Sequence, residues 1–244
     1  MSFEVLTKLS SLNPLFSSQK VDFLNDYEKK RNTDTQGWQY SINEYLFRDE
    51  WDFSKIKRLG CFGCSVTLGV GVKTEDSFVG MLRENTDYNI FNFGISSASI
   101  HHIARMFSEV VNSIDLDVAI ITLPDIARFT LIDNGKIHNI GYNWYADGQK
   151  STHEKIYTAL TEEWFSAFAK DLIRWIEAEA KSKKIKPIFY GHIEETHKII
   201  TEILPRDMYI DFDQEFMFDC TARDNMHPGK EAHKRYANAL LNIL

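Results

Sequence analysis

The sequence predicts an α/β protein built on a mostly parallel sheet that helices cover on both faces. Short apolar segments alternate with amphipathic ones from about residue 56 to the end of the chain. The run "DVAIITLP" at 117–124 is almost continuously apolar after Asp117, as strands are when both faces of a parallel sheet are buried. Alternation of this kind is typical of such sheets. With 244 residues, 43% of them hydrophobic, the chain can form one large domain with a substantial core.

Each element follows from its own pattern. Segments with the short apolar pattern of strands are residues 56–63, 88–94, 117–124, 186–192 and 208–212. Segments with helical spacing of apolar residues are 74–85, 97–113, 153–182 and 227–244. Thr74 is expected to cap the first of these helices, and the apolar stripe of the third includes Trp164 and Trp175.

Two parts of the chain break this alternation. In "LIDNGKI" at 131–137, the pair Asn134 and Gly135 predicts a β-hairpin with a type I′ turn, inserted beside the main sheet. Residues 1–54 are polar and mixed and are expected to form an N-terminal extension with one or two short helices. The main domain is then residues 55–244.

Composition excludes several classes of protein. The net charge of −7 gives no electrostatic footprint for nucleic acid, and the basic tract "KSKKIK" suits the end of a helix. We expect no transmembrane segment and no signal peptide, because no apolar run is long enough. Three cysteines fit a reducing compartment, which suggests the cytoplasm, although an unprocessed viral or phage protein would have the same composition.

The stretch "RLGCFGCSVTLGVGV" at 58–72 allows several interpretations. Cys61 and Cys64 have the spacing of a redox dithiol, but such a motif usually starts a helix, and the residues after Cys64 predict none. A zinc site would need a second pair of Cys or His ligands at suitable spacing. A phosphate-binding loop would need another glycine spacing before Lys73 and Thr74.

A fourth interpretation makes Ser65 a nucleophile. Ser65 follows a glycine at the end of an apolar strand, and open α/β sheets bind ligands at the carboxyl edge of their strands. A serine hydroxyl also needs a base and a carboxylate that orients the base. The segment "DNMHPG" supplies both, because Asp224 and His227 lie three residues apart before a Pro-Gly turn.

These stretches resemble the sequence blocks of the SGNH (GDSL-type) hydrolases. "GCSVTLGVGV" is similar to the block of the nucleophile, with Cys64 where the family usually has aspartate. "NFGISSASI" resembles the second block and places Gly94 at the glycine whose N–H serves the oxyanion hole. "DNMHPG" resembles the last block, on Asp224 and His227, and "YSINEYLFR" at 40–48 resembles a lead-in of some members.

The resemblance covers roughly residues 40–240 and implies a fold and an activity. The implied fold is a flavodoxin-like three-layer sandwich with a mostly parallel five-stranded sheet. The implied activity is ester hydrolysis, in which Ser65 attacks the acyl carbon, His227 transfers the proton and Asp224 orients the imidazole. Neither a cofactor nor a metal is implied, and the substrate would be a small-molecule, glycan or lipid ester.

One departure from the family concerns the oxyanion hole. The third block usually carries an asparagine that completes the hole, and the strand here ends "TLPDIARF" without one. Asp125 is unsuitable because a carboxylate would repel the oxyanion. We therefore expect the N–H groups of Ser65 and Gly94 to act with Arg128. Further candidates for the missing donor are Asn92 and Asn143.

Two alternatives stay open. The missing asparagine suggests a non-catalytic protein of this fold that binds a carbohydrate or a protein. An O-acyltransferase would share the acyl-enzyme step but pass the acyl group to an alcohol instead of water. Of the remaining residues, His101 and His102 are expected to lie in a helix, one half-buried and one exposed. The three cysteines are expected to be small core residues: Cys61, Cys64 and Cys220. The aromatic residues after the hairpin either pack or face the substrate: Tyr142, Trp144 and Tyr145.

Overall fold

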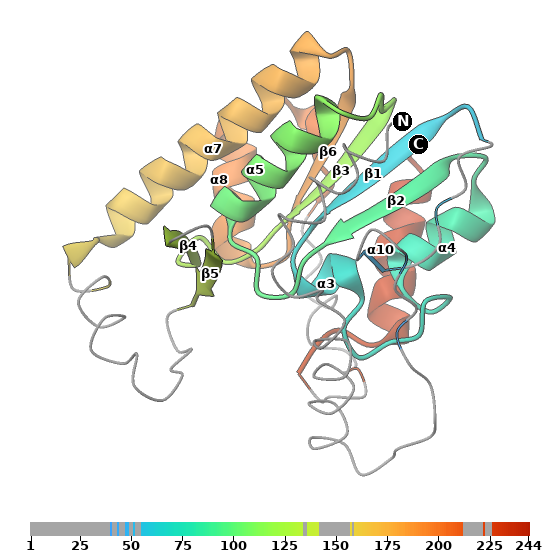
Figure 1. The fold of residues 1–244 in the computed structure, drawn as a ribbon, viewed down its shortest axis with the longest axis horizontal. Coiled ribbons are helices and arrows are strands. Elements are labelled where there is room, and N and C mark those ends of the chain that lie inside the picture. Colours follow the sequence, from blue (N-terminus) through green and yellow to red (C-terminus); the bar gives the residue numbers. More distant parts are fainter. Residues whose placement is uncertain are drawn as a thin grey trace.

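The computed structural model describes residues 40, 43, 47–48, 51, 55–133, 136–141, 157, 159–211, 222 and 226–244. Its centre is a four-stranded sheet in the order β2-β1-β3-β6, in which every neighbouring pair is parallel (Figure 1). The strands are β1 (Arg58–Gly63), β2 (Asn89–Gly94), β3 (Val118–Leu123) and β6 (Lys186–Gly191). All residues of β2 and β3 are buried, which the apolar run of β3 predicts and which in β2 includes Asn89 and Asn92.

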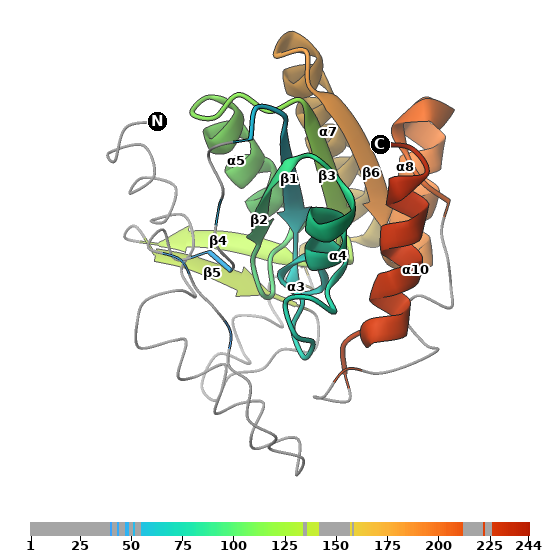
Figure 2. The ribbon, with the colours of Figure 1, turned by 90° about the vertical axis from the view of Figure 1, so that its right-hand side faces the viewer.

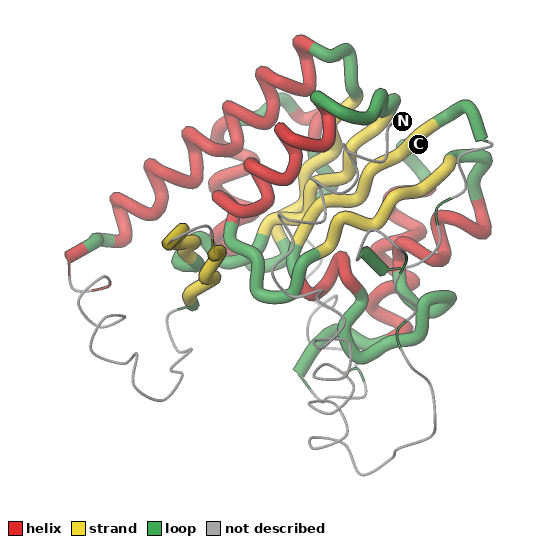
Figure 3. The backbone as a smooth tube through the Cα atoms, in the orientation of Figure 1, coloured by secondary structure: helices red, strands yellow, loops and turns green. Residues whose placement is uncertain are grey.

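Helices cover both faces of this sheet, which confirms the predicted α/β architecture. Helices α5 and α7 lie on one face and α4 and α10 on the other, while α8 lies beside β6 and α7 (Figures 1 and 2). Figure 3 shows the strands enclosed between these helices. Their bounds are α4 (Phe78–Asn85), α5 (Ile100–Val111), α7 (Glu162–Ser182), α8 (Glu194–Ile203) and α10 (Lys230–Leu241).

The strand order creates a topological switch point at the carboxyl edge of the sheet. Strand β1 pairs with β2 on one side and with β3 on the other. The helices that follow β1 and β3 lie on opposite faces, so the chain diverges where these two strands end. Open α/β sheets bind ligands at such a switch point. The residues directly after β1 and β3 are therefore the first place to look for a functional site.

Several boundaries differ from the predicted ones. Helix α4 begins after Ser77, whose Oγ accepts the Gly80 N–H at 3.1 Å, so Ser77 rather than Thr74 is the cap. Helix α7 begins at Glu162, capped by Thr161, and not at residue 153. In place of a fifth strand at 208–212, the described chain has a 3-10 turn, η1 (Arg206–Met208), and one parallel bridge from Tyr209 to Phe189.

Helices α7 and α8 differ from what the spacing of apolar residues predicted. Helix α8, with acidic residues in its first turn and Ile199 and Ile200 buried, has no counterpart among the predicted elements. In α7, Trp164 and Trp175 are 36% and 43% exposed, so they do not belong to the buried stripe. The buried positions of α7 include Phe165, Leu172 and Ile176, and the stripe is rotated from the predicted one.

The predicted hairpin is present as β4 (Phe129–Asp133) and β5 (Lys136–Ile140), an antiparallel pair outside the main sheet. Asp133 pairs with Lys136, so two residues connect the strands, while the type of turn at Asn134 and Gly135 lies outside the described residues. Thr130 Oγ1 bonds to Asn139 Oδ1 at 2.8 Å and to Ser99 Oγ. Because Ser99 also caps α5, the hairpin is fixed to the start of that helix.

Residues from before position 55 pack on the main sheet. The Phe47 ring stacks on Trp51, with 5.5 Å between ring centroids, and meets Phe93 of β2 edge-on at 5.4 Å. Phe47 is fully buried in the core. The domain boundary at residue 54 stays a prediction. Within the described part of the chain, no helix is long and apolar enough to cross a membrane.

Candidate active site

Ser65 lies where β1 ends, at the carboxyl edge of the sheet. It is the first residue of a four-residue helix, α3 (Ser65–Leu68), which ends at Gly69 in the left-handed conformation with φ 76°. The prediction that no helix begins after Cys64 is therefore wrong. Ser65 is 5% exposed, and its Oγ contacts Cys64 Sγ at 4.0 Å. A serine at the start of a helix, directly after a central strand, lies at the switch point of the sheet.

Strand β2 fixes the position of α3 through Gly94. A Cβ added to Gly94 would lie 2.2 Å from Leu68 N and 2.7 Å from Leu68 Cα, so only glycine allows this approach of strand and helix. Asn92, fully buried on the same strand, donates from Nδ2 to Thr67 O at 3.1 Å. The helix that carries Ser65 thus packs directly on the backbone of β2.

The expected role of Gly94 in the oxyanion hole needs correction. The Gly94 N–H donates to Asn92 Oδ1 at 2.9 Å, so this N–H is engaged within the strand and unavailable to an oxyanion. Asn92, a further candidate for that role, uses its own Nδ2 on Thr67. Both residues support α3 instead. Asn143 lies outside the described residues.

The loop after β2 contains Ser97, whose backbone N–H is a further candidate for the oxyanion hole at the carboxyl edge of the sheet. Ser97 has φ 65°, a left-handed conformation that is uncommon without glycine and that occurs often at functional sites. Ser97 is half-exposed. Within the described chain, no hydrogen bond engages the N–H of Ser97 or that of Ser65. Sequence reasoning missed Ser97, because only the backbone angle distinguishes it from its serine neighbours.

The loop after β3 brings Arg128 to this edge. Asp125 Oδ1 accepts the Ala127 N–H at 2.8 Å, and Asp125 O accepts the Arg128 N–H at 3.1 Å. The carboxylate of Asp125 is thus used to shape the turn. Arg128 is half-buried and lies close enough to His192 to influence its pKa. The loop therefore places a permanent positive charge near the carboxyl ends of β3 and β6.

His192, directly after β6, is a site residue that the sequence analysis did not identify. It is 3% exposed, and Nδ1 donates to Leu123 O at 2.8 Å. Burial lowers the pKa of His192 to about 3, with further lowering by the charge of Arg128 and by His227. The imidazole is therefore neutral and leaves Nε2 as an acceptor. Its signal in the sequence was its place immediately after a buried strand.

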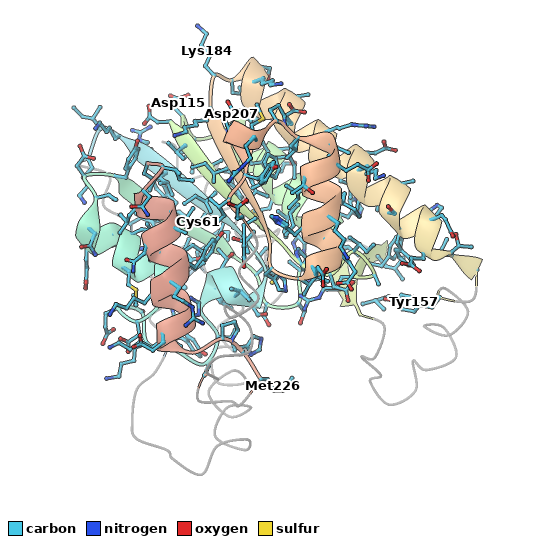
Figure 4. The ribbon with its side chains drawn as sticks, turned by 180° about the vertical axis from the view of Figure 1, so that it is seen from behind. Cys61, Asp115, Tyr157, Lys184, Asp207 and Met226 are labelled. Atoms are coloured by element: carbon cyan, nitrogen blue, oxygen red, sulfur yellow. The ribbon has the colours of Figure 1, made fainter. Side chains whose placement is uncertain are left out.

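His227 lies in the bend that precedes α10, three residues before that helix begins at Lys230. It is half-buried, its carbonyl accepts the Ala222 N–H at 2.7 Å, and it influences the pKa of both His192 and His233. Figure 4 shows Met226, its neighbour in the chain, just beyond the end at which α10 begins. Asp224, the predicted orienting carboxylate, lies outside the described residues, and the complete triad stays a prediction.

His233 connects α10 to α4 beneath this edge. It is fully buried, its Nδ1 accepts the Phe78 N–H at 3.2 Å, and its ring stacks on Phe78. Burial lowers the pKa of His233 to about 3, and the charge of Arg48 lowers it further. His233 is thus a neutral core residue that fixes α10, the helix that follows His227 in the chain.

The other candidate residues have structural roles. Cys61 and Cys64 are fully buried free cysteines, as expected for core residues (Figure 4 shows Cys61 within the sheet), and burial raises the pKa of Cys61 well above its ordinary value. That opposes a reactive thiolate and the redox interpretation. His101 is half-buried, but His102 is 2% exposed and bonds to Asn139, so neither is exposed.

Four residues that the sequence analysis considered lie outside the described residues: Tyr142, Trp144, Tyr145 and Cys220. Among the described residues, no group of three or more His, Cys, Asp or Glu side chains could hold a metal ion.

Comparison with known proteins shows solved structures of similar fold. No protein-family model matches the chain, and no curated protein matches it. Among solved structures, that of TesA is 15% identical and covers 77% of this chain and 98% of its own, with a TM-score of 0.55. A lipolytic protein of the G-D-S-L family from Veillonella parvula is 15% identical over 77% of this chain and 98% of its own, with a TM-score of 0.48.

A GDSL-like lipase from Bacteroides thetaiotaomicron is 13% identical, covers 80% of this chain and 90% of its own and has a TM-score of 0.49. Likeness at this level of identity concerns the fold. The chain has an α/β fold similar to that of TesA, and solved structures of the G-D-S-L family are among the others that it resembles.

Proposed function

We propose that the protein hydrolyses carboxylic esters with Ser65 as the nucleophile. The observation that carries the proposal is the place of Ser65, at the start of α3 and at the end of the central strand β1. His227 belongs to the same edge, as its electrostatic influence on His192 indicates. A hydroxyl at the switch point of such a sheet is suited to attack a substrate bound there.

In this mechanism His227 is the general base. It takes the proton from Ser65 as Oγ bonds to the acyl carbon, and it returns that proton to the leaving alcohol when the ester bond breaks. Water then attacks the acyl-enzyme, giving its proton to His227, and the acid is released as Ser65 regains its hydrogen. Asp224 would hold the imidazole of His227 in the tautomer that this transfer needs.

The choice of His227 over His192 follows from their surroundings. A general base works best when its pKa lies near the working pH. The pKa of His192 is lowered to about 3, so His192 is too weak a base at neutral pH. It supplies instead a neutral acceptor at Nε2, beside the histidine that moves the proton.

The oxyanion would be stabilised by donors from three neighbouring loops. These are the N–H of Ser65, the N–H of Ser97 and the guanidinium of Arg128, because the Gly94 N–H is engaged elsewhere. Removing one such donor typically costs about 3 kcal/mol of transition-state stabilisation. Arg128 replaces the asparagine that the family usually has in its third block.

The test is hydrolysis of p-nitrophenyl acetate and butyrate by the wild type and by Ser65→Ala and His227→Gln. We expect each substitution to lower kcat/KM by at least about 10³-fold. Ser113→Ala is the matched control, since Ser113 follows α5 at the opposite edge of the sheet. Equal rates for the wild type and Ser65→Ala would refute the proposed function on these substrates.

A further inference from the structure

Arg48 is a buried cation whose donors converge on the loop after α3. Its side chain is 1% exposed and is the largest among the fully buried side chains of the described residues. One terminal nitrogen, Nη1, donates to Leu68 O at 2.7 Å and to Gly69 O. The other, Nη2, donates to Val72 O at 2.7 Å and to Thr74 Oγ1 at 3.4 Å.

Tyr40 holds the same loop from the other side. The Arg48 guanidinium lies over the Tyr40 ring, 4.6 Å from its centroid, and Tyr40 OH accepts the Gly71 N–H at 2.8 Å. Gly69 and Gly71 have φ values of 76° and 82°. The side chains of Tyr40 and Arg48, both from the segment before residue 54, thus support a loop in which two glycines have the left-handed conformation.

This loop in turn holds the backbone of Ser65. The N–H groups of Gly69 and Val70 both donate to Ser65 O, each at 3.0 Å. Helix α3 has only four residues, and so short a helix forms too few internal hydrogen bonds to be stable alone. A continuous set of bonds therefore runs from Arg48 through the carbonyls of Leu68 and Gly69 to the backbone of Ser65.

Burying a guanidinium is costly unless its donors are satisfied together. The planar fork of arginine can satisfy carbonyls that converge from several directions, whereas the single ammonium of lysine cannot span them in the same way. The bonds of Nη1 and Nη2 to this loop therefore offset part of the cost of burying Arg48, and they are made only when the carbonyls of the loop converge. A loop held in this way presents Ser65 in one orientation.

We propose that Arg48 is a positioning residue for Ser65, acting through the loop of residues 69–74 with Tyr40 as its support. The inference rests on the proposed function of Ser65 as nucleophile. The segment before residue 54, which carries Tyr40 and Arg48, then contributes to catalysis, although these residues lie well before Ser65 in the sequence.

The test compares Arg48→Lys and Tyr40→Phe with Phe47→Leu. Phe47 is the neighbouring residue, fully buried in the core but without a hydrogen bond from its side chain to the loop, so Phe47→Leu controls for loss of packing. Kinetics on p-nitrophenyl acetate are measured well below each variant's Tm. We expect Arg48→Lys to lower kcat by about 10- to 100-fold with KM within about 3-fold, and Tyr40→Phe to have a smaller effect in the same direction.

Phe47→Leu is expected to lower Tm and to leave kcat within about 3-fold of the wild type. An unchanged kcat for Arg48→Lys would overturn the proposal, and so would an equal fall of kcat for Phe47→Leu at a matched loss of Tm.

A second measurement is independent of activity. Amide hydrogen exchange is followed for the peptide that contains Gly69 and Val70, whose N–H groups bond to Ser65 O. We expect Arg48→Lys to speed exchange there by at least about 10-fold relative to peptides of α7 and α8. Acceleration spread evenly over the chain would overturn the positioning role. If the wild type proved inactive, the function of Ser65 would fail, while this exchange result would still decide whether Arg48 holds the loop.

Discussion

Replacing Gly94 by alanine tests how closely Ser65 depends on the backbone contact between β2 and α3. The new Cβ would lie 2.2 Å from Leu68 N and 2.7 Å from Leu68 Cα. These are backbone atoms, so they cannot turn aside as the end of a side chain can. Relief of the contact requires α3 to move from β2 by about 1 Å, and a displacement of that size typically costs about 100-fold in rate, or about 2.7 kcal/mol.

Gly60→Ala is the matched control for this substitution. Its Cβ would meet Phe62 Cε2 at 2.7 Å and Leu116 Cδ1 at 2.9 Å, which are the ends of side chains that can move. Both variants add one methyl group to the core, which typically lowers the free energy of unfolding by about 1–3 kcal/mol. Only Gly94→Ala is expected to displace Ser65.

The assay is the second-order rate of reaction with a fluorophosphonate, together with urea unfolding of each variant. We expect the rate for Gly94→Ala to fall by about 100-fold and that for Gly60→Ala to stay within about 3-fold of the wild type. Equal rates for the two variants would refute the argument that the glycine sets the position of α3.

Three further predictions follow from buried groups. His192 and His233 have pKa values lowered to about 3 from the ordinary 6.5, so below about pH 6.5 the unfolded chain binds more protons. Stability is then lost as pH falls toward 3, and urea unfolding should show a loss of about 2 kcal/mol per histidine between pH 7 and 5. Ser99→Ala removes the cap of α5 and the bond to Thr130, and should lower the free energy of unfolding by about 1–2 kcal/mol. Cys61, fully buried, should resist iodoacetamide in the native protein and react after unfolding, as peptide mass spectrometry can show.

Each of these predictions has a contradicting result. A free energy of unfolding that is the same at pH 7 and pH 5 would contradict the burial of the two neutral histidines. An unchanged stability of Ser99→Ala would mean that water replaces both hydrogen bonds. Rapid alkylation of native Cys61 would contradict its place inside β1.

The main strands, and the place of Ser65 at their carboxyl edge, could be predicted because their signals are local. Strand β3 is a nearly continuous apolar run, and strands that alternate with helices leave few other arrangements. Ser65 was proposed as a nucleophile because a glycine and a serine follow such a strand. Its proposed partners in "DNMHPG" came from chemistry, since a serine nucleophile requires a base, and the triad stays a prediction because the structure does not describe Asp224.

Helix α3 could not be predicted because distant residues stabilise it. Val66 and Thr67 are β-branched and disfavour a helix, and four residues are too few to show a period of 3.6. Gly94 and Arg48 supply the stability through contacts that no local pattern records. For the same reason Arg48 was not predicted to support the site.

The cap of α4 and the start of α7 were misplaced for a different reason. Thr74 and Ser77 are both good capping residues, and a turn in which the Ser77 N–H bonds to Thr74 O separates them. In α7, periodicity extended the helix toward residue 153, whereas Thr161 caps it by accepting the Trp164 N–H. Two candidate caps on one segment cannot be ranked without the contacts of the folded chain.

The central claim is that Ser65 is an activated nucleophile, and labelling by a fluorophosphonate with mapping of the adduct by mass spectrometry tests it most directly. One adduct, on Ser65, is expected in the wild-type protein, and labelling is expected to be lost in both Ser65→Ala and His227→Gln. An unlabelled wild-type Ser65, or labelling of Ser65 at an unchanged rate in His227→Gln, would show that Ser65 is not activated in this way.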